Sequence, residues 1–116
     1  GKTGIATTAP AATLDVNGDF KLGAAGVVHT ALLRTTASIN LPSIAANSES
    51  DITVTVTGAS TTASSVFVSP AADIEAGLVI AWARVSAANT VKIRFRNETG
   101  SAIDPAAVNY VVSVLQ

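Results

Sequence analysis

The stretch from Leu78 to Asn97 constrains the fold of this chain more than any other. Its second half alternates apolar and cationic side chains: Val91, Lys92, Ile93, Arg94, Phe95 and Arg96. A period of two predicts a β-strand with one buried face and one wet face. Its first half, LVIAWARVSA, holds the only Trp of the chain and ends at an expected turn over Ala87-Ala88-Asn89. The stretch therefore predicts two strands in tandem, joined as a hairpin.

Further strands are expected on both sides of this hairpin. Residues 27–40 are rich in β-branched side chains and are expected to form one long strand or two short ones, with a helix over Thr30–Ala37 as the alternative. Residues 65–69 are expected to form one short strand. Asp51–Thr57 alternates strictly, with Ile52, Val54 and Val56 facing inward. Val108–Leu115 is apolar on nearly both faces, which is typical of a strand in the middle of a sheet or at a subunit interface.

Gly, Pro and Asn residues separate these segments at short intervals. Many short strands with such punctuation indicate an antiparallel sandwich rather than alternating strands and helices. We therefore expect an all-β fold, with an antiparallel β-sandwich or jelly-roll-like domain over residues 27–116. Residues 1–26 are expected to form an extended N-terminal segment for fibre or inter-subunit contact.

The N-terminal segment contains a hairpin signal. Leu14–Val16 and Asp19–Leu22 flank Asn17-Gly18, the dipeptide that favours a type I′ turn. The sequence therefore predicts a small antiparallel hairpin over residues 14–22.

The same segment resembles a known repeat of fibrous proteins. Residues 4–10, GIATTAP, followed by residues 14–18, LDVNG, look like the G-I-G-T-x-x-P-x-x-x-L-D-V-x-G segment of phage tail-fibre and bacterial surface-fibre proteins. Ala6 replaces the usual Gly, and nothing resembles the self-cleaving chaperone domain that follows in many relatives. The resemblance covers about 15 of the 116 residues and implies a trimeric, intertwined β-region of a long fibre.

Composition favours self-association and excludes several partners. Apolar residues make up 48% of the chain, but most are Ala and Val, so the core is expected to be thin and another copy to cover part of the apolar surface. A net charge of −1 gives no general attraction to nucleic acid or anionic membranes. No apolar run reaches the roughly 18 residues of a membrane span. With no Cys, disulfides and thiol chemistry are excluded.

No motif announces catalysis, a metal or a cofactor, and none is expected. The single histidine, His29, lacks a second His or a nearby acidic residue for a metal site, and no nucleophile elbow accompanies it. Asn97-Glu98-Thr99 fits the N-glycosylation pattern, although the same residues also read as the entry to a loop that ends at Gly100.

The cationic row has two interpretations. Lys92, Arg94 and Arg96, with Arg84 on the neighbouring strand, form either a strip that binds anionic glycan or phosphate, or a solvent face. As a solvent face it could also pair with acidic residues of another subunit, namely Asp73, Glu75 or Glu98. The residues selected as candidate ligand contacts are Trp82, Arg84, Arg94 and Tyr110.

Together these features predict a non-enzymatic structural subunit of an extracellular or virion fibre or appendage. It would self-associate through β-strands as a homotrimer or as a strand-exchanged filament. The alternative is a carbohydrate- or receptor-binding β-sandwich module. Phage or cellular origin, and the identity of any receptor, stay open.

Overall fold

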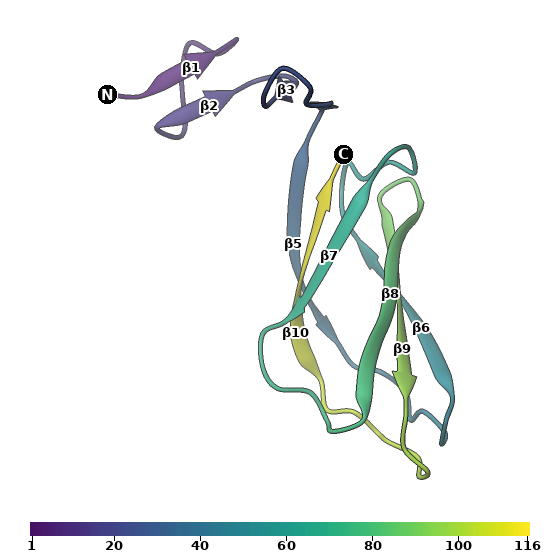
Figure 1. Cartoon of the computed structure of the whole chain (residues 1–116). Coiled ribbons are helices and arrows are strands. Elements are labelled where there is room, and N and C mark those ends of the chain that lie inside the picture. The colour runs from purple at the N-terminus through teal and green to yellow at the C-terminus, as the bar shows by residue number, and fades with distance from the viewer.

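Two three-stranded antiparallel sheets pack face to face as a β-sandwich (Figure 1). One sheet has the strand order β5 (Leu32–Ile39), β10 (Val108–Leu115) and β7 (Ser65–Pro70). The other has the order β6 (Glu49–Thr55), β9 (Thr90–Asn97) and β8 (Leu78–Ala87). This computed structural model describes all 116 residues, and it confirms the expected all-β fold. It contains no helix long and apolar enough to cross a membrane.

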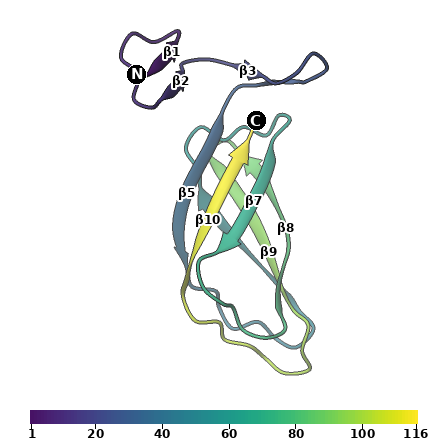
Figure 2. The same cartoon turned by 60° about the vertical axis from the view of Figure 1, so that its left-hand side comes forward.

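An arm, residues 1–31, projects from one end of the sandwich (Figures 1 and 2). It contains four short strands: β1 (Thr3–Ile5), β2 (Leu14–Val16), β3 (Phe20–Lys21) and β4 (Val28–His29). The arm makes the molecule elongated, with extents of 56 × 28 × 24 Å.

The hairpin predicted over residues 14–22 is wrong. β2 pairs in parallel with β1, and β3 pairs with β4. Asn17 explains the difference, because its backbone N–H donates to the carbonyl of Ile5 at 2.9 Å and its side-chain amide donates to that of Ala6 at 3.2 Å. These bonds hold β2 against β1, and Gly18 has a φ of 152°, far from the value that a type I′ turn needs.

The sandwich core follows the alternation of the sequence. Val91, Ile93 and Phe95 of β9 are fully buried, and Phe95 meets Tyr110 of β10 edge to face with ring centroids 5.6 Å apart. The remaining core side chains come from both sheets and from the loops that join them: Ile39, Leu41, Ile44, Val54, Val56, Ala59, Leu78, Val85, Val112 and Val114. As predicted, β10 lies in the middle of its sheet.

A β-bulge at Ala81 sets the orientation of β8. Ile80 pairs with Phe95 and Trp82 with Arg94, so Ala81 has no partner on β9. Without an extra residue, strict alternation would place Ile80 and Trp82 on the same face. The bulge lets Ile80 pack against the core while Trp82 lies on the outer face.

The side chain of Asn97 closes the end of the sandwich opposite the arm. It is 0% exposed, and its amide group donates to the carbonyls of Ile44, Ala45 and Ser101. Its carbonyl oxygen accepts hydrogen bonds from the backbone N–H and the hydroxyl of Thr99, at 2.8 and 2.7 Å. A glycan on this amide is incompatible with the fold, so Asn97-Glu98-Thr99 is a loop entry.

Candidate functional site

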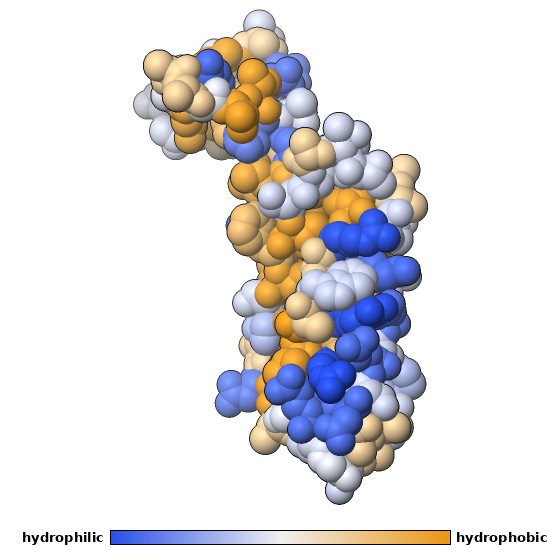
Figure 3. All heavy atoms as spheres, turned by 45° about the vertical axis from the view of Figure 1, so that its right-hand side comes forward, coloured by the Kyte–Doolittle hydropathy of each residue, from blue (hydrophilic) through white to orange (hydrophobic).

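The outer face of the sheet β6-β9-β8, here called the charged face, is organised in rows across the three strands. Strand register places Glu49 beside Arg96, Asp51 beside Arg94 and Thr53 beside Lys92. On the other side of β9, Trp82 lies beside Arg94 and Arg84 beside Lys92. Figure 3 shows hydrophilic side chains gathered in a band over one side of the sandwich. The face therefore has two rows with an acidic residue and one without.

The middle row is a fixed assembly of three side chains. Arg94 donates two hydrogen bonds to the carboxylate of Asp51, at 2.6 and 2.9 Å, and its guanidinium carbon lies 4.7 Å from the ring centroid of Trp82. Two parallel hydrogen bonds orient the guanidinium, and a cation over an indole face is attractive. Arg94 also lies 3.3 Å from a carboxylate oxygen of Glu49, which approaches Arg96 at 3.4 Å.

Two acidic residues of the same chain pair with the cationic row. The sequence interpretation names Asp73, Glu75 and Glu98 of another subunit, whereas in the single chain Glu49 and Asp51 pair with Arg94 and Arg96. Glu98 adds a longer contact of 3.8 Å to Arg96. The sequence alone does not identify Glu49 and Asp51 as the partners, because only the register between β6 and β9 places them beside the arginines.

The third row has no acidic residue. Arg84 and Lys92 lie directly opposite one another across β8 and β9, with Thr53 on the other side. Neither cation forms an ion pair, whereas both neighbouring arginines do. The unpaired positive charge of this face is thus concentrated in one place, next to Trp82.

The structure brings three of the four predicted contact residues together. Trp82, Arg84 and Arg94 share the charged face, and Trp82 is 37% exposed. Tyr110 is separate, because it points into the core from the other sheet and is 2% exposed. Burial raises the pKa of its phenol, and the negative charge of Glu75 adds to the effect. Tyr110 is therefore not a ligand contact on this face, whereas Lys92, which lies opposite Arg84, is a candidate.

We expect the Asp51–Arg94 pair to make stability depend on pH in acid. The hydrogen bonds from Arg94 lower the pKa of Asp51 below its ordinary 3.8, and the same bonds raise the pKa of Arg94. The contribution is complete above the ordinary pKa of Asp51 and is lost as pH falls through its lower folded value. Thermal unfolding midpoints between about pH 7 and about pH 2 should fall less steeply in D51N than in wild type. D73N, which removes an exposed carboxylate without a partner, should retain the wild-type slope.

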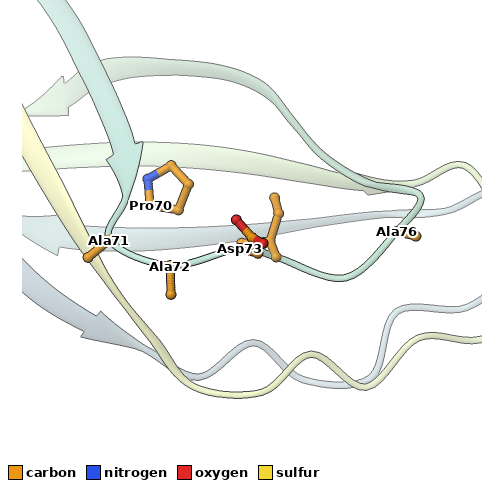
Figure 4. Close-up of a pocket in the computed structure, with 6 residues that line it drawn as sticks. Pro70, Ala71, Ala72, Asp73 and Ala76 are labelled. Atoms are coloured by element: carbon orange, nitrogen blue, oxygen red, sulfur yellow. The ribbon is translucent and has the colours of Figure 1, made fainter.

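Four cavities lie on the surface of the molecule. The largest cavity, about 520 Å³, opens beside the loop after β7 (Figure 4). Apart from Asp73, its lining side chains have no polar group: Pro70, Ala71, Ala72, Ile74 and Ala76. A binding pocket needs several polar groups that converge on a ligand, and this one lacks them. No group of three or more His, Asp or Glu residues that could hold a metal ion is present.

A second surface of interest carries almost no charge. The outer face of the sheet β5-β10-β7, here called the neutral face, has Arg34 as its only charged residue. On this face Phe67 is 58% exposed, and Leu32 is exposed at the end that adjoins the arm. A cavity of about 300 Å³ continues from Leu32 and Leu115 into the arm. The arm contributes the rest of its lining: Phe20, Leu22, Gly26, Val27 and His29.

No protein-family model matches this chain, and comparisons with curated proteins and with solved structures give no match.

Proposed function

We propose that the protein is a non-enzymatic structural subunit of an extracellular or virion fibre or appendage. In this proposal, copies of the chain associate through the arm and the neutral face, as a trimer or as a strand-exchanged filament. The charged face stays accessible on the outside of the assembly.

The conformation of the arm carries the proposal. β1 and β2 form a parallel pair of three residues each, and no other strand joins them. Parallel sheets normally occur with both faces covered, and an isolated two-stranded unit is marginally stable in water. All three residues of β1 are exposed. A pair of this kind needs further strands or side chains to cover it, and a second arm supplies both.

The distribution of apolar surface supports the same conclusion. Five of the eight large apolar side chains that are exposed belong to the arm, although the arm is about a quarter of the chain: Ile5, Leu14, Leu22, Val27 and Val28. Leu22 is 77% exposed. Figure 3 shows hydrophobic surface on the arm. Contiguous apolar surface of this kind is typical of interaction sites.

The fibre-like segment has a backbone that suits its pattern. Ala6, where the resembled segment carries Gly, has a φ of 57°, a left-handed value that Gly adopts without strain. A Cβ at Gly4 would lie 2.9 Å from the Cγ of Pro10, so the close approach of these two residues requires Gly. Two of the three positions at which the pattern specifies Gly therefore have conformational reasons to do so.

Replacing apolar side chains of the proposed interface by charge tests the proposal. We expect the wild type to sediment as a trimer or a larger species, and the double variant L22D/F67D as a folded monomer. Both side chains are exposed in the single chain, at 77% and 58%, so the circular dichroism spectrum should stay that of wild type. Electron microscopy of the wild type separates discrete trimers from filaments.

T57D/A72D is a matched control, because it adds the same charge at exposed positions outside the arm and the neutral face. It should keep the oligomeric state of the wild type. A monomeric wild type at micromolar concentration, or an L22D/F67D variant that still assembles, would contradict the proposal.

A further inference from the structure

We propose that the charged face binds an acidic saccharide, with a carboxylate or sulfate held between Arg84 and Lys92 and a sugar ring against Trp82. This site goes beyond the structural role, because assembly through the arm and the neutral face does not require it.

The charge distribution gives the first argument. The outer face of this sheet carries four cations and two carboxylates, an excess of two positive charges in a chain whose net charge is −1. Ion pairs with Glu49 and Asp51 neutralise two of the cations, so the excess is confined to Arg84 and Lys92. Like charges directly opposite across two strands are destabilising unless an anion bridges them. An acidic group at this point would accept charge-assisted hydrogen bonds from both side chains.

The indole ring gives the second argument. The bulge at Ala81 turns Trp82 outward, and Arg94 lies over its ring at 4.7 Å. Because Asp51 holds Arg94 through two hydrogen bonds, the ring is supported by a fixed neighbour. A preorganised aromatic side chain loses little conformational entropy when a ligand binds. The partly exposed ring thus offers an apolar surface to a ligand, and the cations lie on the same face of the sheet.

The spacing favours a saccharide over a longer polyanion. Trp82 and Arg84 are two residues apart on one strand, or about 7 Å. An acidic substituent of a sugar can therefore reach the cations while the sugar ring lies on the indole. In the other two rows Glu49 and Asp51 pair with Arg96 and Arg94, so a polyphosphate backbone that ran along the face would meet no further unpaired cation. A single acidic group with an apolar ring face fits what the site offers.

Trp82 is the only Trp of the chain, so its fluorescence reports directly on the site. Hexagalacturonate and a sulfated oligosaccharide of similar length are the two probes, and fully methyl-esterified hexagalacturonate is the neutral comparison. We expect a saturable change in Trp82 emission with at least one acidic probe and a much weaker response to the ester. About 1 M NaCl, where the Debye length is about 3 Å, should weaken binding. The two acidic probes distinguish a carboxylate ligand from a sulfate ligand.

The double variant R84A/K92A should bind about tenfold or more weakly, because it removes both charge-assisted contacts. K21A/R34A removes the same charge from the arm and the neutral face, and it should bind within about twofold of wild type. Absence of saturable binding to either acidic probe would overturn the proposal, as would equal losses in the two variants. If neither probe binds and R84A/K92A alters the oligomeric state, the cations meet carboxylates of a second copy instead, and the site is not a saccharide site.

Discussion

The variant F95A is expected to lose about 3–5 kcal/mol of unfolding free energy, the largest effect of any single truncation in this chain. Phe95 is fully buried on the central strand of one sheet, and its ring contacts Tyr110 on the central strand of the other. Its removal leaves a cavity between the sheets and ends the aromatic contact. Domains of this size are stable by about 5–15 kcal/mol, so much of the total would be lost. Urea unfolding followed by circular dichroism measures the difference.

F95L is the matched control for this experiment. Leucine keeps most of the buried volume, so we expect a loss of about 1 kcal/mol. If F95A and F95L were equally stable, Phe95 would not be the side chain on which the two sheets pack.

The second large effect is expected for N97A, at about 3–4 kcal/mol. The substitution removes five hydrogen bonds that the side chain makes to Ile44, Ala45, Thr99 and Ser101. Each hydrogen bond contributes about 1 kcal/mol net to stability. The three carbonyl groups each keep another donor in the variant, so none is left without a hydrogen bond and the loss of stability is limited. Because the bonds join two loops to the end of β9, hydrogen exchange should also quicken in residues 41–48 and 98–103.

N109A is the control, since Asn109 is an exposed asparagine on β10 whose side chain makes no hydrogen bond. It should unfold within about 0.5 kcal/mol of wild type. A small effect for N97A, with exchange unchanged in the two loops, would show that other contacts close this end of the sandwich.

The sandwich was predictable because local patterns specify it. Strict alternation in β9 and β6 identified the buried face, and the two-sided apolar pattern of β10 identified a central strand. Asn89 marked the turn between β8 and β9 and has the left-handed φ of 59° that Asn tolerates. In each case a short stretch of sequence contains both the signal and its structural consequence.

The remaining features depend on residues far apart in the sequence. The Asn17-Gly18 signal was overridden because Asn17 finds hydrogen-bond partners in the strand formed by residues 3–5, and no local pattern reveals that pairing. The bulge at Ala81 has no signal of its own. For the candidate site, Trp82 and Arg84 were identified on the correct face, but the neutralisation of Arg94 by Asp51 requires the register between β6 and β9.

The central place of β10 has a consequence for the order of folding. β5 and β7 hydrogen-bond only to β10 and never to each other, whereas the sheet of β6, β8 and β9 is complete once residue 97 has been synthesised. During synthesis, both outer strands of the neutral sheet therefore wait with unpaired backbone groups until residues 108–115 emerge. Unpaired strand edges readily accept strands from other chains. Insertion of β10 is therefore the step that completes this sheet and pairs the open edges of β5 and β7.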